Sequence, residues 1–422
     1  MDPVTHGIAG ALIGKGFFAH RSSSTNRLLF KKGSSSTARV AVFAATLGAV
    51  FPDVDIFVEA FSHDPLAIAR YHRGFTHSFV GLPIFAAALA WLTRVSVRWY
   101  AKRTHRDDLR CPSFYMLFLI YAAGIASHII LDGFTSFGTR MLNPFSKDRV
   151  AWDFLFIIDF VFTALILLPQ LAAWVHQRRE GATNRAAKAW GFCTILTLGV
   201  WSLARAAEFP FSLSIVILAA AFFVALFFLP ALNGWGSRII SRASWCRTGF
   251  YVACAYILLC GFAHHAAMSR VRAFAATHDL NVEKIGAMPL PPSFLDWNGM
   301  VLTPDGVYQA GFSLRDASRP NFRFVPDSSP NLFTEEAARL EPVRTYLWFA
   351  RFPVVRFMAA GGRNIVEYAD PRFFEGNARK GPMPFTFAVI FDSQGRLLHY
   401  GWVRGPNPLG SIAPPDLSGR PR

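Results

Sequence analysis

Long apolar runs separated by short polar loops dominate the first 270 residues of the chain. A helix needs roughly 20 mostly apolar residues to cross a bilayer, and six runs approach or reach that length. They lie near residues 78–97, 114–131, 154–175, 189–206, 211–232 and 249–268. Two shorter runs, 4–19 and 40–51, are marginal for a full crossing and could form a partly inserted hairpin. The pattern predicts a polytopic bundle of transmembrane helices.

The residues after 270 follow a different pattern. Pro289, Pro291 and Pro292 interrupt the chain, and short stretches of strand-like composition follow. The predicted strands cover residues 306–314, 344–358, 364–368, 384–391 and 396–403. We therefore predict a mainly α protein that carries a small C-terminal β-rich (α+β) domain. The predicted limits are 1–175 for the helical domain with the polar motifs, 176–270 for additional transmembrane helices and 271–422 for the β-rich domain.

Composition and charge support a membrane protein and orient it. Hydrophobic residues make up 52% of the chain and charged residues 17%, against roughly 25% charged in soluble domains. The loops at 20–39, 94–110, 176–188 and 235–247 carry 18 Lys and Arg, so the positive-inside rule places them in the cytoplasm. The other loops and the C-terminal domain are then predicted to face the periplasm. The net charge of +16 suits anionic lipid headgroups, and no recognised module supports nucleic-acid binding.

Short polar motifs gather at the outward ends of the predicted helices under this topology. They are His6, the PDVD sequence at 52–55, the HRGFTHS sequence at 72–78, the HIILD sequence at 128–132, and the acids Asp153 and Asp159. An unpartnered carboxylate at the end of an apolar span is costly. Helical bundles build metal sites from polar side chains on separate facing helices. We therefore expect a metal site at the outward-facing surface of the membrane that the helices cross.

His128 and Asp132 are the strongest pair. Their four-residue spacing puts both side chains on one face of a helix, and imidazole and carboxylate groups are good ligands for zinc or manganese. In the 52–55 motif, alternate residues of an extended segment share one side, so both carboxylates can face one cation. Each motif alone also has a structural alternative: a hydrogen bond that closes a helix end, a solvated turn, or a polar loop rich in caps.

The 72–78 motif adds two histidines to the predicted site. Gly74 permits a tight turn, and Thr76 can cap the following helix, which would place His77 in its first turn. His6 alone is a weak signal, since a lone histidine is more often structural. None of the five cysteines forms a CxxC pair, so the sequence indicates neither a zinc ribbon nor a disulfide framework.

These motifs resemble those of the YdjM-like family, whose members are described as bacterial inner-membrane, metal-dependent hydrolases. The resemblance is carried by His6-Gly7 and the motifs at 52–55, 72–78 and 128–132, and it covers roughly residues 1–175. Segments 289–297 and 370–373 resemble the tails of longer members. The order of histidines and aspartates is also similar to that of zinc-dependent phospholipase C and related single-strand nucleases, although this chain lacks a clear match to all of their ligands.

The leading hypothesis is a metal-dependent hydrolase with a divalent ion, zinc first and manganese second. The candidate metal ligands are His6, Asp55, His72, His77, His128 and Asp132. Asp53 would orient or deprotonate a water, and Arg73 would stabilise developing negative charge. Asp153 and Asp159 would orient the metal-binding imidazoles through hydrogen bonds without contacting the metal themselves. A site at the lipid–water boundary favours a lipid or lipid-linked phosphoester, and membrane lipids are the expected partners.

Two other hypotheses compete with the hydrolase. The same residues could hold a metal structurally, or pair with one another, in a non-catalytic membrane protein whose outward domain binds a partner. The atoms that coordinate the metal would distinguish the hydrolase from the structural site. In a structural site protein ligands fill every coordination position, whereas a catalytic site keeps one position for water. A transporter is the least favoured, because the acidic residues lie at the ends of the spans and no inverted repeat is visible.

Overall fold

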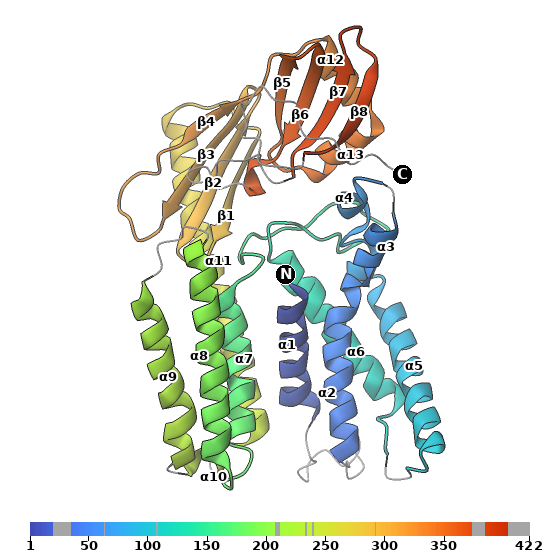
Figure 1. Cartoon of the computed structure of the whole chain (residues 1–422), viewed down its shortest axis with the longest axis vertical. Helices are drawn as coiled ribbons and strands as arrows, with labels where there is room; N and C mark the ends of the chain where they lie inside the picture. The colour runs from blue at the N-terminus through green and yellow to red at the C-terminus, as the bar shows by residue number, and fades with distance from the viewer. Residues whose placement is uncertain are drawn as a thin grey trace.

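The computed structural model describes residues 1–19, 35–62, 64–106, 109–206, 212–232, 234–238, 240–291, 293–373 and 385–403. Helices gather at one end of the molecule and two β-sheets at the other (Figure 1). The long helix α11 (Arg242–Thr277) leads from the helical part directly into the first sheet. The predicted fold class, a helical membrane part with a C-terminal α+β region, is confirmed.

The helical part contains the following elements in chain order. They are α1 (Pro3–Ile13), the π-helix η1 (Gly14–Phe18), α2 (Ser35–Val50), the 3₁₀ turn η2 (Phe51–Asp55), α3 (Ile56–Phe61), α4 (Ala67–Tyr71), the 3₁₀ turn η3 (Phe75–His77), α5 (Leu82–Arg103), α6 (Phe114–Gly133), α7 (Phe160–Val175), α8 (Ala182–Ala206), α9 (Leu213–Leu232), α10 (Trp235–Arg238) and α11. Within the described residues, five helices are long and apolar enough to cross a membrane. Segment 67–77 together with α5 would make a sixth span with a bend of 72°.

Three spans differ from the sequence prediction. The run at 40–51, predicted to be marginal, belongs to an apolar helical stretch of 23 residues, Ser36–Val58, that continues through η2. The run predicted at 78–97 becomes helix α5 only from Leu82, after the turn η3. Helix α7 begins at Phe160 rather than at 154, because the Asp159 side chain accepts a hydrogen bond of 2.9 Å from the Phe162 amide and so caps the helix.

Small residues let α1, α2 and α6 approach one another closely. A Cβ atom on Gly10 of α1 would lie 2.5 Å from the Ala45 carbonyl oxygen of α2, and one on Gly124 of α6 would lie 2.7 Å from the same oxygen. Close packing through small residues is typical of membrane helices, where dispersion contacts and not the hydrophobic effect hold helices together. This packing brings together the ends of the three helices that carry the polar motifs.

The C-terminal region contains two four-stranded antiparallel sheets, each with its strands in sequence order. The first sheet consists of β1 (Lys284–Leu290), β2 (Asp296–Thr303), β3 (Gly306–Ser313) and β4 (Arg323–Pro326). Helices α12 (Leu332–Arg339) and α13 (Glu341–Phe349) follow. The second sheet consists of β5 (Val354–Ala360), β6 (Arg363–Ala369), β7 (Phe387–Asp392) and β8 (Leu397–Trp402), with the 3₁₀ turn η4 (Pro371–Phe373) before β7. The first sheet packs on the end of α11, where Val271 lies in one core with Trp297 and Val301. The second packs on α12 and α13.

Two strand predictions in this region were wrong. The stretch 344–358 is not one strand: it divides into helix α13 and strand β5. Val343, Tyr346 and Phe349 are buried at intervals of three residues, which is a helical spacing, and a proline at the start suits a helix N-terminus. Strands β1, β2 and β4 were not predicted; for the first two, Pro289 was interpreted as a break although it lies near the end of β1.

The C-terminal region lies over the end of the helical part that carries the polar motifs, and the segment between α6 and α7 (the α6–α7 segment, residues 134–159) runs between them (Figure 1). Arg351, between α13 and β5, donates two hydrogen bonds of 2.8 Å to the Asp153 carboxylate of this segment. Arg70 at the end of α4 binds Glu341 of α13 at 2.7 Å. These charged contacts fix the β-rich region directly above the polar motifs.

Candidate metal centre

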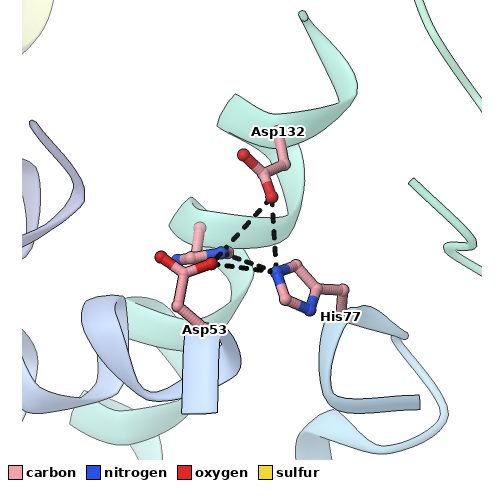
Figure 2. Close-up of side chains that lie close together, drawn as sticks. Asp53, His77 and Asp132 are labelled. Atoms are coloured by element: carbon pink, nitrogen blue, oxygen red, sulfur yellow. Dashed lines mark hydrogen bonds and ion pairs between the residues drawn. The ribbon is translucent and has the colours of Figure 1, made fainter. Parts of the chain in front are cut away.

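Three separate elements bring four polar side chains to one point. Asp53 comes from the turn η2 that follows α2, His77 from the turn η3 that precedes α5, and His128 and Asp132 from the last turns of α6. We call these four residues the His/Asp cluster. Figure 2 shows Asp53, His77 and Asp132 pointing toward one another. The helical spacing of His128 and Asp132 places both on one face of α6, as predicted.

The donor atoms of the His/Asp cluster lie at closely similar separations. His77 Nε2 and His128 Nε2 are 3.0 Å apart. Each of these nitrogens lies 3.4 Å from Asp53 Oδ1 and 3.4 Å from Asp132 Oδ2. Ligands about 2.0–2.2 Å from a tetrahedral zinc ion lie roughly 3.3–3.6 Å from one another. The four side chains therefore already stand close to the spacing that one divalent ion requires.

Burial and unmet hydrogen-bonding capacity also fit an ion. The side chains of His77, His128 and Asp132 are 0% exposed, and that of Asp53 is 12% exposed. Asp53 Oδ2 and Asp132 Oδ2 are buried without a hydrogen-bond partner. Two carboxylates this close repel each other unless a cation lies between them. The chain therefore holds a cluster of residues that could bind a metal ion.

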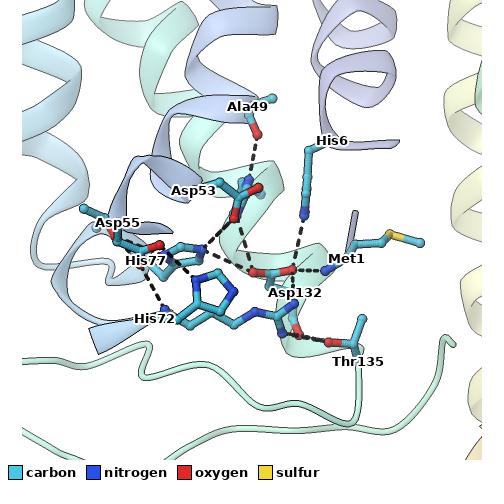
Figure 3. A network of polar contacts seen from close by, with 12 residues as sticks. Met1, His6, Ala49, Asp53, Asp55, His72, His77, Asp132 and Thr135 are labelled. Atoms are coloured by element: carbon cyan, nitrogen blue, oxygen red, sulfur yellow. Dashed lines mark hydrogen bonds and ion pairs between the residues drawn. The ribbon is translucent and has the colours of Figure 1, made fainter. Parts of the chain in front are cut away.

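Contacts on the far side of each imidazole orient its ring. His128 Nδ1 lies 2.7 Å from the Ala49 carbonyl oxygen at the end of α2 (Figure 3). His77 Nδ1 lies 3.1 Å from Asp55 Oδ2 and 3.0 Å from Thr76 Oγ1. A ligand imidazole usually donates its second nitrogen to a carbonyl or carboxylate in this way, which leaves the other nitrogen free for the metal.

Asp55 is the centre of a second set of contacts outside the cluster. Its carboxylate accepts hydrogen bonds from the Arg73 amide and the Thr76 hydroxyl, both at 3.0 Å, and lies 2.9 Å from His72 Nδ1 (Figure 3). Arg73 has a positive φ of 57°, a conformation that is costly for a residue with a side chain. The contacts to Asp55 hold the 72–77 segment in this conformation and so fix His77.

Asp132 uses its second oxygen to bind groups outside the cluster. Its Oδ1 atom lies 2.9 Å from Arg73 Nη2 and 3.2 Å from His6 Nε2, and it also contacts the Met1 amino group. The His6 ring stacks on the His128 ring with centroids 3.6 Å apart. Arg73 also donates to the Thr135 hydroxyl at 2.8 Å. Arg73 and His6 thus orient the Asp132 carboxylate.

The structure reverses the positions that we predicted for Asp53 and Asp55. Asp55 was the predicted ligand and Asp53 the predicted base, but Asp53 lies in the cluster and Asp55 lies behind His77. The predicted ligands His6 and His72 stand beside the cluster, against Asp132 and Asp55 respectively. The alternating spacing showed that these acids act together, but it could not show which of them faces the imidazoles.

The two remaining predicted residues contact other groups. Asp153 binds Arg351 of the C-terminal region, and Asp159 caps α7 and accepts hydrogen bonds from the hydroxyls of Tyr256, at 2.8 Å, and Ser293. Both therefore join elements of the fold rather than hold imidazoles of the cluster. Burial acts to lower the pKa of Arg351, but the charge of Asp153 outweighs it and raises that pKa overall.

Comparison with known proteins places this architecture in a family. The family described as YdjM inner membrane protein matches residues 1–267. The chain belongs to the YdjM inner membrane protein family. The match extends beyond the predicted resemblance of 1–175 and ends within α11, so it includes all four cluster residues and all the candidate spans up to that helix. Family and helices together show a multi-pass inner membrane protein.

A further relative matches only part of the chain. The uncharacterized protein YfhP of Bacillus subtilis (strain 168) is 30% identical over 153 residues, which are 36% of this chain and 42% of YfhP. The chain thus aligns with less than half of that relative's length. No solved structure matches this chain. The resemblance of segments 289–297 and 370–373 to the tails of longer YdjM-like proteins stays a prediction.

Sequence reasoning missed several residues that shape the centre. The Ala49 carbonyl orients His128, and no side-chain pattern could have shown it. Thr76 was expected to cap the following helix, but it binds Asp55 and His77 instead, and α5 starts only after Gly81. Thr135 lies three residues after Asp132 and could have been noticed as a polar neighbour of the 128–132 motif.

Proposed function

We propose that the chain is a metal-dependent hydrolase whose centre faces the periplasm and acts on a lipid or lipid-linked phosphoester. One observation carries the proposal: two imidazole nitrogens 3.0 Å apart each lie 3.4 Å from a carboxylate oxygen of Asp53 and from one of Asp132, a spacing that suits one divalent ion. Asp53, His77, His128 and Asp132 would hold the ion.

The chemistry of the donor set supports a hydrolase and zinc, with manganese second. The cluster offers two imidazole nitrogens and two carboxylate oxygens and contains no cysteine. Structural zinc sites are mostly built with cysteine, whereas hydrolytic zinc sites combine histidine with a carboxylate. A bound divalent ion supplies Lewis acidity and makes hydroxide available at neutral pH.

The residues around the cluster have distinct roles in this proposal. Asp53 is the only partly exposed member, so it forms the side from which a substrate enters. Its Oδ2 atom has no hydrogen-bond partner and can accept a proton from an attacking water. Asp55 fixes the His77 ring, and Arg73 acts by holding Asp132 in place. The guanidinium of Arg73 is already bound to Asp132 and Thr135.

The position of the centre supports a lipid substrate. The cluster lies where the apolar stretch Ser36–Val58 and helix α6 end. Exposed apolar side chains surround this level of the molecule, among them Phe57 and Phe61 of α3 and Phe145 of the α6–α7 segment. Trp and Tyr side chains at the end of a span are typical of the lipid–water interface, and Tyr71 of α4 and Trp152 of the α6–α7 segment are exposed here. A phosphoester group of a lipid would lie at that same depth.

A second candidate function is a structural metal centre in a non-catalytic membrane protein. The observation that favours it is the near-complete burial of the cluster together with four protein donors. Structural sites have closed coordination, whereas catalytic sites keep a position for water. In that case the C-terminal region would bind a partner, and the ion would only stabilise the outward ends of α2 and α6.

Turnover of a substrate panel separates the two candidates. The protein is purified in detergent, freed of metal, loaded with Zn²⁺ or Mn²⁺, and incubated with phosphodiesters and lipid phosphates. The proposal expects metal-dependent hydrolysis that Asp53→Asn and His128→Ala remove, while the control His265→Ala, at an exposed histidine of α11, keeps it. Stoichiometric metal with no hydrolysis of any substrate, and a large fall in melting temperature on metal removal, would favour the structural centre.

A further inference from the structure

Two arginines of the α6–α7 segment lie beside the centre, and neither has a carboxylate partner among the residues that the structure describes. All hydrogen bonds that Arg140 and Arg149 make within the described part of the chain go to backbone carbonyls. Arg140 Nη2 donates to the Arg70 carbonyl at 2.7 Å, and Arg149 Nη2 donates to the Ala69 carbonyl at 2.6 Å. The Nε atoms of both side chains are buried and have no hydrogen-bond partner.

Neighbouring arginines differ from Arg140 and Arg149 because each of them binds a carboxylate. Arg70 binds Asp64 at 2.9 Å, Arg351 binds Asp153 at 2.8 Å, and Arg372 binds Asp370 at 2.9 Å. Buried charges in proteins are normally paired, because an uncompensated charge is costly in a medium of low dielectric constant. Arg140 and Arg149 are therefore exceptional within their own surroundings.

The carbonyl groups compensate only part of this charge. Four of them belong to the end of helix α4 and to His72 just after it, and the fifth is that of Gly138 in the α6–α7 segment. A helix C-terminus attracts cations. A helix of five residues has a small dipole, however, and a carbonyl carries no net charge. Burial, together with the guanidinium groups of Arg140, Arg372 and Arg73, lowers the pKa of Arg149. The positive charge of Arg140 and Arg149 is therefore not fully compensated by the groups that contact it among the described residues.

Aromatic rings hold the two guanidinium groups side by side and connect them to the centre. Trp348 lies 5.6 Å from the Arg140 guanidinium and 5.1 Å from that of Arg149. Phe137 lies between Arg149, at 5.5 Å, and Arg73, at 4.9 Å. Arg73 in turn binds Asp132 of the His/Asp cluster. The pair is half-exposed, so a ligand from the periplasmic side would reach it.

We propose that Arg140 and Arg149 form a binding site for a phosphate group. The guanidinium fork matches phosphate oxygens, and one phosphate would compensate both cations. This inference deepens the proposed function, on which it rests for the statement that the phosphate is part of the substrate.

The test measures phosphate binding in metal-free protein, so it does not depend on the metal centre. The full chain in detergent is treated with a chelator, and its melting temperature is followed against inorganic phosphate at constant ionic strength. A ligand that binds only the folded state raises the melting temperature in a saturable way. We expect Arg140→Gln and Arg149→Gln each to weaken the apparent phosphate affinity about ten-fold, the loss expected for one charged hydrogen-bonding partner.

Matched variants keep the test decisive. Arg363→Gln removes the same charge from an exposed position of β6 and should leave phosphate binding unchanged. If Arg149→Gln does not fold, Arg149→Lys keeps the charge and loses the fork, and it should weaken binding to a smaller extent. A wild-type chain without a saturable phosphate response, or variants that respond as wild type does, would overturn the proposal and leave the arginines as helix caps.

A second arm identifies the source of the phosphate. Short-chain phosphatidic acid is compared with inorganic phosphate on the same metal-free protein. Tighter binding of phosphatidic acid, lost in Arg140→Gln, indicates a lipid headgroup, and equal binding indicates a soluble phosphate; both results uphold the site. Failure of the proposed hydrolase would appear separately, as intact phosphate binding without metal-dependent turnover.

Discussion

Asp53 and Asp55 are two residues apart, yet the turn η2 gives them different chemical environments. Asp53 Oδ1 lies 3.4 Å from both cluster imidazoles, whereas Asp55 lies behind His77 and also binds His72 and the Arg73 amide. A carboxylate behind a ligand imidazole makes that ligand more basic and fixes its orientation. The two acids should therefore affect metal binding to different degrees.

Replacing Asp55 tests its role behind His77. Asp55→Asn keeps the shape of the side chain but removes the negative charge that faces His77 Nδ1. We expect metal affinity to fall about 10–100-fold, which is the usual loss when such an outer partner is changed. Competition with a chelating dye of known affinity measures it, with Asp148→Asn, an exposed acid of the α6–α7 segment, as the control. Wild-type affinity in Asp55→Asn would refute this role.

The sequence predicted only part of the membership of the site: His77, His128 and Asp132 lie in the cluster, whereas the predicted ligands His6, Asp55 and His72 stand beside it. Spacing alone identified His128 with Asp132, and both are in the cluster. The exchange of Asp53 and Asp55 followed from the 3₁₀ geometry of η2, because the prediction assumed an extended segment. The Ala49 carbonyl belongs to the backbone, so no side-chain pattern could have revealed its contact with His128.

At the scale of elements, the centre depends on how closely α1, α2 and α6 pack. Gly10 and Gly124 both face the Ala45 carbonyl at distances that exclude a side chain. Asp53 follows α2 directly, and His128 lies one helical turn beyond Gly124 on α6. A displacement of α2 from α6 would therefore move Asp53 and the Ala49 carbonyl away from the imidazole of His128.

Alanine substitutions at glycines test this coupling of packing and metal binding. In Gly124→Ala the new methyl group would overlap α2, so we expect the free energy of unfolding to fall by about 1–3 kcal/mol and metal content to fall with it. Gly191→Ala and Gly199→Ala are matched controls on α8, since a Cβ there meets nothing within 4 Å. They should be neutral or stabilising by up to about 1 kcal/mol. Equal effects at all three positions would contradict the packing argument.

Apolar length predicted the helices well, and the C-terminal strands less well. The long run at 114–131 corresponds to α6 because a fully apolar stretch of that length has few alternatives. The 344–358 stretch was misassigned because its aromatic residues suit strands by composition, while the burial of Val343, Tyr346 and Phe349 follows a helical spacing. Tertiary packing against the second sheet favoured the helix over the strand in the first part of this stretch.

At the scale of the whole molecule, the β-rich region is joined to the helical part by buried charge pairs. Arg351 and Asp153 form a bidentate contact with exposed fractions of 20% and 5%. Arg372 adds a hydrogen bond of 3.1 Å to the Ser136 carbonyl. The α6–α7 segment is thus held on one side by the C-terminal region, and on the other its Thr135 and Trp152 amides donate to the Asp132 and Gly133 carbonyls at the end of α6.

Breaking the Arg351–Asp153 pair tests this connection. Arg351→Ala leaves a buried carboxylate without a partner, which costs about 3 kcal/mol or more. We expect a lower melting temperature and faster hydrogen exchange in residues 134–159. The exposed pair Arg339–Glu336 is the control, and its disruption should cost well under about 1 kcal/mol. Unchanged exchange in Arg351→Ala would show that the connection contributes little.

Orientation in the membrane is the second test at this scale. The basic loops predict that the C-terminal region faces the periplasm. A cysteine introduced at the exposed Ser329 should react with a membrane-impermeant thiol reagent in intact cells, whereas one at Glu180 should react only after lysis. The native Cys111 and Cys254 are partly exposed and are first replaced by serine, whereas Cys193, Cys246 and Cys260 are buried and give a low background. The opposite labelling pattern would reverse the topology.

Metal content of the purified protein tests the central claim most directly. The account predicts about one Zn²⁺ or Mn²⁺ per chain in the wild type, and less than about a tenth of that in His77→Ala and His128→Ala, because each removes one of four donors. His265→Ala should retain the wild-type content. Protein that contains no bound metal, or variants that keep the wild-type amount while remaining folded, would contradict it.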